Sequence, residues 1–367
     1  MIIPRELLLP QQTIAGDGSI KRLIGEAMVF GVRGVVVHGR SLVAGGGLEA
    51  IMAVAPQGAE VVSYCHEGRE PTLQDVDRLR EFLVESGCDW VAAVGGGSVV
   101  DLAKAAAGLR DAPLPTGDYQ RGAKIAASVV PLIAAPTTAG TGSEATVVSV
   151  LTDPERELKQ SIRHASFMPR LVVLDAELLH SCPRRTIAAS GLDAFVQALE
   201  SYTSRHANGF TRALSELALV AITENLLAVY SGDFTNAEAL LEGSYLAGLA
   251  LSHARLGLVH GLAHPLGSRW HAAHGLTCAV CLPPVLDFNR PVIGAALEDL
   301  RLRLGIDVER QVADWMDEMK LESPFAGEAI RDREAIIRET LTSGSTAANP
   351  RAVTAEDVEV LLDNIFC

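Results

Sequence analysis

The sequence predicts an α/β domain built on a Rossmann-like parallel sheet, followed by an all-α domain. Short β-branched runs alternate with helical patterns in the first half of the chain, and strand-like runs stop after about Pro183. The length of 367 residues also suits two domains. We place the boundary at residue 185, so that the expected domains are residues 1–185 and 186–367.

Five continuous apolar runs in the first half are expected to be strands. They are residues 34–37, 61–64, 90–94, 129–135 and 171–174. Strands that are apolar at consecutive positions are buried on both faces, as in a parallel sheet covered by helices. Amphipathic segments such as 73–86 supply those helices.

The second half carries apolar residues three and four positions apart, which is the helical period. The segments with this pattern are 187–204, 210–230, 237–253 and 308–321. Thr354 is expected to cap a last helix that runs through Ile365.

Composition excludes several classes of partner. The chain has 31 Lys and Arg against 45 Asp and Glu, and its net charge of −14 repels nucleic acid and anionic lipid. No apolar run is long enough to span a membrane, because residues 125–136 are interrupted by Ser128 and Pro131. The N-terminus lacks a signal-peptide core and the six cysteines are dispersed, which predicts a cytoplasmic protein with reduced thiols. Cys278 and Cys281 are interpreted as buried small side chains.

A glycine-rich turn follows the strand expected at 90–94. It reads GGGS over residues 95–98 and leads into a helical pattern over 99–108. Glycines let the backbone approach a pyrophosphate, and the first N–H groups of a helix attract it. The spacing is not a complete GxGxxG, so a tight turn without a ligand is the alternative.

A second polar turn, residues 136–144, follows the strand expected at 129–135. It contains Thr137, Thr138 and Thr141. Open α/β sheets bind ligands at the carboxyl ends of their strands, although an irregular loop with satisfied hydroxyls has the same composition. Two such turns in one domain favour a dinucleotide.

The end of the first strand bears on the choice of dinucleotide. NAD-binding folds often place an acid near this point, whereas this chain has Gly39, Arg40 and Ser41. Arg40 and Ser41 suit the 2′-phosphate of NADP, and an exposed surface arginine is the alternative. The sequence thus predicts NADP(H) or NAD(H), with NADP(H) favoured.

The second half contains a cluster of metal-binding residue types. His260 and His264 are four residues apart, as are Asp193 and Gln197, so each pair shares one helix face. His274 lies ten residues beyond His264. A carboxylate and imidazoles from separate helices suit a catalytic divalent ion.

Five segments along the chain resemble the signatures of the iron-containing (group III) alcohol dehydrogenases. They are GGGSVVDLAK at 95–104, PTTAGTGSE at 136–144, GLDA at 191–194, GLVHGLAHPLG at 257–267 and NPR at 349–351. The resemblance implies a dehydroquinate-synthase-like fold with a metal in the cleft between a nucleotide domain and a helical domain. It also implies NAD(P)-dependent interconversion of small alcohols and aldehydes, and a homodimer or larger homo-oligomer.

By position, the resemblance assigns an Fe²⁺ or Zn²⁺ ion to four ligands. It places His264 beside the substrate and nicotinamide, where we expect it to relay a proton. The ligand positions are Asp193, Gln197, His260 and His274. The cofactor positions are Gly96, Gly97, Ser98, Asp101, Thr137, Thr138, Thr141 and Lys159.

Two departures from the family pattern bear on function. Gln197 stands where the family has His, and an amide is the weaker ligand, so a metal-independent reductase of the maleylacetate type and a nucleotide-binding protein with a decayed metal site are alternatives. A dehydroquinate-synthase-like lyase, which shares the fold, cofactor and metal cleft, is a further alternative. Arg269 stands where the family has an aromatic residue. We expect it to bind an anionic tail on the substrate, and a solvent-facing arginine is the alternative.

Overall fold

The computed structural model describes residues 1–156 and 158–367. Its backbone forms two compact units, Leu8–Cys182 and Pro183–Cys367, and the second also includes Met1–Leu7. The predicted first domain, which began at residue 1, differs from the first unit in this N-terminal segment. Its backbone carbonyls explain the difference, because those of Met1 and Ile2 accept hydrogen bonds from the N–H groups of Gly209 and Phe210 at 3.1 and 2.7 Å.

The first unit contains a six-stranded, all-parallel sheet with the strand order β1-β8-β5-β4-β2-β3. Its strands are β1 (Gln12–Ala15), β2 (Arg33–Gly39), β3 (Glu60–His66), β4 (Trp90–Gly95), β5 (Leu132–Pro136) and β8 (Leu171–Leu174). The predicted Rossmann-like class is confirmed, and the five expected strands correspond to β2, β3, β4, β5 and β8.

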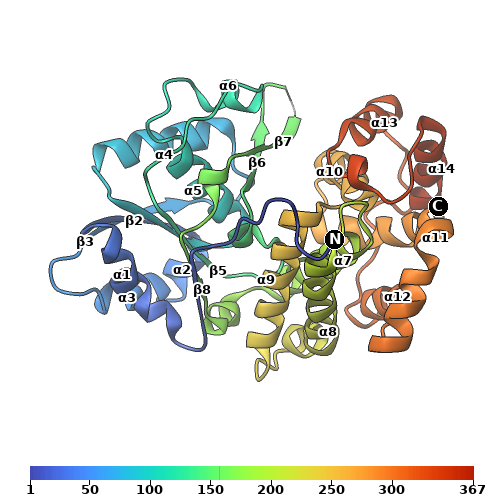
Figure 1. Cartoon of the computed structure of the whole chain (residues 1–367), viewed down its shortest axis with the longest axis horizontal. Coiled ribbons are helices and arrows are strands. Elements are labelled where there is room, and N and C mark those ends of the chain that lie inside the picture. The colour runs from blue at the N-terminus through green and yellow to red at the C-terminus, as the bar shows by residue number, and fades with distance from the viewer. Residues whose placement is uncertain (157) are drawn as a thin grey trace. The chain divides into compact units, whose positions relative to one another are not determined.

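Helices cover both faces of this sheet (Figure 1). Val35 and Val37 pack into one core with α4 and α5, whereas Val36 packs into the other core with α1 and α3. This alternation explains why the strands are apolar at consecutive positions. The helices are α1 (Leu23–Ala27), α2 (Arg40–Ala44), α3 (Gly47–Ala53), α4 (Leu73–Glu85), α5 (Gly97–Leu109) and α6 (Thr116–Gln120).

An antiparallel hairpin in the same unit was not predicted. It consists of β6 (Val148–Asp153) and β7 (Leu158–Arg163), which pair from Val148 with Arg163 to Asp153 with Leu158. Side chains of β6 alternate between half-buried and buried. This period of two is short, and polar residues interrupt it, so it gave a weak strand signal.

The second unit is helical. Its helices are α7 (Arg184–Thr203), α8 (Gly209–Ser231), α9 (Ala237–Ala254), α10 (Leu258–Trp270), α11 (His274–Leu304), α12 (Val308–Glu318), α13 (Arg333–Thr342) and α14 (Ala355–Phe366). The predicted helices correspond to α7, α8, α9, α12 and α14, and Thr354 caps α14 by accepting a hydrogen bond from the Asp357 N–H. Three internal prolines, at 283, 284 and 291, hid the 31-residue α11 from prediction.

One helix among the described residues, α8, is by length and composition long enough and apolar enough to cross a membrane. It has 23 residues, and an 18-residue window within it has a mean hydropathy of 1.4, with 39% of that window buried. The helix packs against both α7 and α9, with Ala218, Leu219 and Ile222 fully buried. We therefore interpret α8 as a core helix of the helical unit.

Candidate functional site

Apart from Lys159, which is on β7, the predicted nucleotide residues lie at or just after the carboxyl ends of β2, β4 and β5. β2 and β4 are neighbours in the sheet, and the strand order reverses between them, since β3 lies outside β2 and β5 lies outside β4. Open α/β sheets bind ligands at such a reversal. Gly96 caps the N-terminus of α5 there, so the first N–H groups of this helix are directed beyond the sheet edge.

The two signature turns contact each other at glycine positions. A Cβ on Gly97 would lie 2.6 Å from Thr141 Cγ2, and one on Gly96 would lie 3.3 Å from Thr138 Cγ2. Ser98, Thr137 and Thr138 are half-buried and Thr141 is exposed. Only glycine permits this approach, so the arrangement is a small cradle of backbone N–H groups and hydroxyls that fits a pyrophosphate.

Asp101 and Lys104 hold the second turn in place from α5. Asp101 accepts hydrogen bonds from the Ser143 hydroxyl and, at 3.0 Å, from the Val150 N–H. Lys104 Nζ donates to Ser143 O at 2.6 Å and to Val148 O at 2.6 Å. Burial raises the pKa of Asp101 and lowers that of Lys104 to about 8. Because protein donors already bind the Asp101 carboxylate, its role is to hold the second turn in place.

Arg40 follows Gly39, which caps α2, and both Arg40 and Ser41 are exposed. The Arg40 guanidinium lies 3.1 Å from a carboxylate oxygen of Glu67. Lys159, on β7, donates to Glu70 at 2.8 Å. Both cations therefore have an acidic partner on the protein.

Four ligand-type side chains converge within the helical unit. Asp193 comes from α7, His260 from α10, and His274 and Cys278 from α11; one ligand atom of each lies within 4.8 Å of all the others. Asp193 Oδ1 lies 3.2 Å from His260 Nε2 and 3.7 Å from His274 Nε2. The cluster is buried except for His274, which is half-buried.

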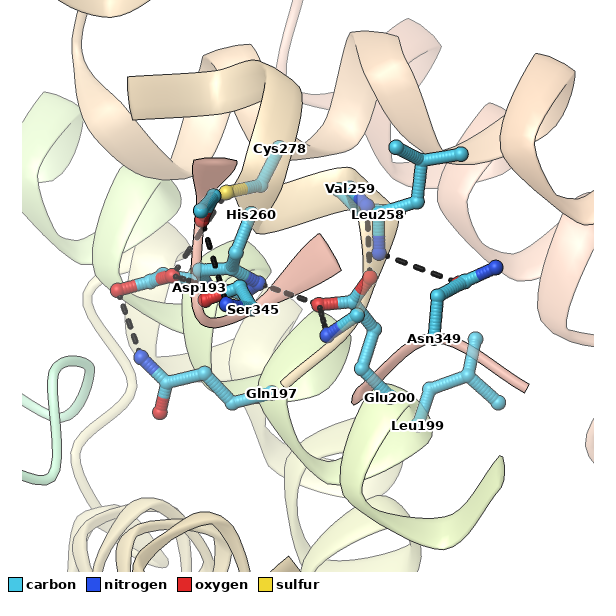
Figure 2. Close-up of polar contacts among 12 residues, drawn as sticks. Asp193, Gln197, Leu199, Glu200, Leu258, Val259, His260, Cys278, Ser345 and Asn349 are labelled. Atoms are coloured by element: carbon cyan, nitrogen blue, oxygen red, sulfur yellow. Dashed lines mark hydrogen bonds and ion pairs between the residues drawn. The ribbon is translucent and has the colours of Figure 1, made fainter. Parts of the chain in front are cut away.

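Glu200 orients His260 from α7 (Figure 2). Its carboxylate accepts a hydrogen bond from His260 Nδ1 at 2.6 Å, and also from the N–H groups of Gly257 at 2.9 Å and Val259 at 2.7 Å. These N–H groups begin α10, where a helix favours negative charge. With Nδ1 donating to Glu200, His260 directs Nε2 at Asp193, the arrangement typical of metal-ligating histidines.

The NPR segment, residues 349–351, hydrogen-bonds to the start of α10. Asn349 Oδ1 accepts from the Leu258 N–H at 3.2 Å and from Asn289 Nδ2 at 2.9 Å. Arg351 donates to Phe288 O at 2.6 Å and stacks on the Phe288 ring at 4.0 Å. This segment therefore supports the helix end that carries His260.

Two other predicted residues, Gln197 and His264, lie next to these four side chains. Gln197 donates Nε2 to Asp193 Oδ2 at 2.9 Å, and its buried Oε1 has no hydrogen-bond partner among the described residues. The half-buried His264 ring stacks on His274, with centroids 5.3 Å apart and planes 9° apart. His253, which also lies near this cluster in sequence, bonds instead to the Leu249 carbonyl at 2.8 Å.

Two family profiles together match nearly the whole chain. The iron-containing alcohol dehydrogenase profile matches residues 10–176, and the profile of the Fe-containing alcohol dehydrogenase family, C-terminal, matches residues 187–366. The chain belongs to the iron-containing alcohol dehydrogenase family. It is an NAD(P)-dependent oxidoreductase that acts on CH–OH groups, as the predicted function stated.

Two curated relatives and one solved structure illustrate the similarity. The probable alcohol dehydrogenase EutG of Escherichia coli (strain K12) is 38% identical over 288 residues, 77% of this chain and 73% of that protein. Lactaldehyde reductase of Escherichia coli (strain K12) is 32% identical over 304 residues, 78% of this chain and 80% of that protein. The iron-containing alcohol dehydrogenase of Thermococcus thioreducens is 28% identical with a TM-score of 0.90, covering 98% and 99% of the two chains.

Membership of the alcohol dehydrogenase family does not favour the metal-independent reductase or the lyase alternative. The donor set of this chain also fits a divalent cation. Burial by itself would lower the pKa of His260, but Cys278, Asp193 and Glu200 raise it well above its ordinary value. Independently of this shift, four ligand-type atoms within 4.8 Å of one another, a buried carboxylate among them, suit a divalent cation.

Arg269 pairs with the protein rather than standing free for an anionic substrate tail. Its guanidinium donates to both carboxylate oxygens of Glu339, at 2.9 and 2.6 Å. It also donates to the Pro265 carbonyl at 3.2 Å. This bidentate pair joins α10 to α13, and the substrate role of Arg269 stays a prediction that would require exchange of Glu339 for the anionic tail.

Two residues of the cluster were not predicted as functional. Glu200 lies seven residues after Asp193, two helical turns along the same face of α7, and this spacing was the available signal. Cys278 was interpreted only as a buried side chain; it is buried, but it lies 3.8 Å from His274 Nε2. Its position four residues after His274 is the same helical spacing that linked the other candidate ligands.

Proposed function

We propose that this enzyme reduces short aldehydes with NADPH or NADH, and oxidises the corresponding alcohols, at a divalent-metal site in its helical unit. The observation that carries the proposal is the convergence of Asp193, His260 and His274, with Glu200 fixing His260 for ligation. Relatives named as an alcohol dehydrogenase and a lactaldehyde reductase support small alcohols and aldehydes as the substrate class.

Asp193, His260 and His274 would hold the metal. When bound, the metal supplies Lewis acidity that polarises a carbonyl oxygen and stabilises negative charge on it. Glu200 keeps the His260 tautomer in which Nε2 is available, and the burial of Asp193 and His260 excludes water from the ligand atoms. Fe²⁺ and Zn²⁺ both suit such mixed oxygen and nitrogen ligands.

His264 is proposed as the proton relay. It lies one helical turn after His260 on α10 and stacks on the ligand His274, so its ring adjoins the cluster without belonging to it. Its half-buried position allows proton exchange with solvent. A histidine is suited to this task because its pKa is ordinarily close to neutral pH.

The nucleotide pyrophosphate is proposed to bind Gly96, Gly97, Ser98, Thr138 and Thr141. The close approach of the two turns supports this assignment, because a Cβ on Gly97 would collide with Thr141. Further predicted contacts are Gly39, Arg40, Ser41, Thr137 and Lys159, with Asp101 acting on the second turn. Arg40 is the residue proposed to receive a 2′-phosphate, by exchanging Glu67 for that anion.

The test measures oxidation of NADPH and NADH with short aldehydes, before chelation, after chelation, and after return of single metals. Turnover is expected to disappear with the chelator and to return with one ion. Asp193→Asn is expected to abolish metal-dependent turnover while leaving NADPH binding unchanged. Asp299→Asn, which alters an exposed ion pair with Arg303, is the matched control and should retain turnover. Full turnover in the chelator, or in Asp193→Asn, contradicts the proposal.

We also propose that the enzyme is cytoplasmic and forms a homodimer or a larger homo-oligomer. Support comes from the family resemblance and from six cysteines that are all free. Light scattering coupled to size-exclusion chromatography measures the assembly, and a monomeric mass contradicts that part.

A further inference from the structure

The two oxygens of Asp193 face different neighbours. Oδ1 lies 3.2 Å from His260 Nε2, 3.7 Å from His274 Nε2 and 3.9 Å from Cys278 Sγ. Oδ2 instead accepts a hydrogen bond from Gln197 Nε2 (Figure 2). Gln197 therefore contacts the oxygen that does not lie against the histidines and the thiol.

Cys278 has the position of a fourth ligand. Its side chain is fully buried, and Sγ lies 3.8 Å from His274 Nε2, one turn earlier on α11. Ligand atoms about 2.0–2.3 Å from a zinc ion are about 3.3–3.8 Å apart in a tetrahedron. Four of the six separations, those from Asp193 Oδ1 and that between the His274 and Cys278 atoms, are 3.2–3.9 Å, and all six are within 4.8 Å, so the atoms lie close to tetrahedral spacing.

Gln197 is poorly placed to be that ligand. Its amide nitrogen, which faces Asp193 Oδ2 at 2.9 Å, carries protons and has no lone pair for a metal. Turning the amide over would bring the unpartnered Oε1 against Oδ2, a contact of two oxygens that only a cation bound by both would stabilise. In the observed orientation, Gln197 holds Oδ2 and thereby directs Oδ1 at the other three ligand atoms.

We propose that Cys278, and not Gln197, supplies the fourth protein ligand of the metal, while Gln197 is a positioning residue for Asp193. The inference rests on the proposed metal site and extends it. On binding, the Cys278 S–H bond breaks, its proton passes to the buffer and its electron pair forms the sulfur–metal bond. A thiolate is a soft ligand, so the site selects Zn²⁺ or Co²⁺ over Mn²⁺ and Mg²⁺.

Cobalt substitution tests the inference by a readout that is independent of turnover. The full-length enzyme, kept reduced, is stripped of metal and titrated with Co²⁺ while bound metal and the absorption spectrum are measured. One bound Co²⁺ with a thiolate-to-cobalt charge-transfer band in the near ultraviolet is expected. Cys278→Ser should lose this band and still bind Co²⁺ through Asp193, His260 and His274.

Two variants separate coordination from packing. Cys281→Ser, a control at the next buried cysteine of α11, should keep the band. Gln197→Ala should also keep it, with weaker Co²⁺ binding because Asp193 is less fixed.

A wild-type enzyme that binds one Co²⁺ without the band overturns the role of Cys278 and leaves the proposed function standing. A band that persists in Cys278→Ser also overturns it. If the wild type binds no Co²⁺ and turns over in chelator, both the inference and the proposed metal function fail. The wild-type spectrum is decisive even if Cys278→Ser does not fold.

Discussion

Replacing Glu200 with Gln tests how the protein prepares His260 for metal binding. The substitution keeps the size of the side chain, but it removes the charge and changes one acceptor oxygen into an NH₂ donor. Glu200 accepts three hydrogen bonds, from His260 Nδ1 and from the N–H groups of Gly257 and Val259. In either amide orientation, the new NH₂ faces at least one of these donors.

The expected magnitude follows from these contacts. Losing a hydrogen bond to a charged group costs about 1.5–3 kcal/mol, and a buried N–H left without a partner adds a similar penalty. We therefore expect the unfolding free energy of the metal-free enzyme to fall by about 3–6 kcal/mol. If the NH₂ faces His260, the imidazole must carry its proton on Nε2, which then cannot bind a metal. Metal affinity should fall about 10–100-fold, as for other partners of ligating histidines.

The assay is a competition titration of Zn²⁺ or Co²⁺ against a chromophoric chelator, together with urea unfolding of the metal-free protein. Glu216→Gln is the matched control, because Glu216 lies on α8 in a surface pair with Arg303. Such pairs contribute about 0–1 kcal/mol, so the control should change little. A Glu200→Gln enzyme that is destabilised but keeps wild-type metal affinity refutes the tautomer argument and leaves Glu200 a purely structural role.

Three other perturbations test separate parts of the structure. Arg40→Ala should raise the KM for NADPH about 10–100-fold more than the KM for NADH. Glu67→Gln should instead shift the preference toward NADPH. Equal effects on both nucleotides contradict the 2′-phosphate role. Burial and Asp101 raise the pKa of Glu144 to about 7, so the folded state holds a proton between pH 4.5 and 7 that the unfolded state has released. Stability should therefore fall by up to about 3 kcal/mol as pH rises through this window, and Glu144→Gln, followed by urea unfolding at several pH values, should remove that dependence. Gly275→Ala should cost about 3 kcal/mol or more, because its Cβ would lie 1.7 Å from a carbonyl oxygen of α7. Gly294→Ala on the same helix, whose nearest contact would be 3.8 Å away, should be tolerated in the same unfolding assay.

The sheet was predictable because burial on both faces imposes a pattern that short segments carry by themselves. β2 and β4 are apolar at consecutive positions, since Val35 and Val36 enter different cores. The β6–β7 hairpin was not predictable in this way, because its stability depends on contacts remote in sequence. Asp101, for example, binds the Val150 N–H 49 residues later.

The metal cluster was predictable where two ligands share one helix or one family motif. Asp193, His260 and His274 were identified and converge in the structure. A residue that only hydrogen-bonds to a ligand has no such sequence signature. In the sequence, Glu200 is one of many glutamates. Its role depends on the start of α10 lying against α7, which places two N–H groups and an imidazole around a single carboxylate.

The departure of Gln197 from the family pattern has a different meaning once the side chains are in place. Taken alone, an amide in place of an imidazole weakens a metal site. In the structure, the amide holds one oxygen of Asp193 while a thiol lies beside the other oxygen. The cluster therefore has a ligand-type side chain from α11 beside one oxygen of Asp193, while Gln197 on α7 acts on the other oxygen. With Cys278 as a ligand the site would have four protein ligands, one of them a soft thiolate, and metal preference rather than metal binding would distinguish it from a site of oxygen and nitrogen ligands alone.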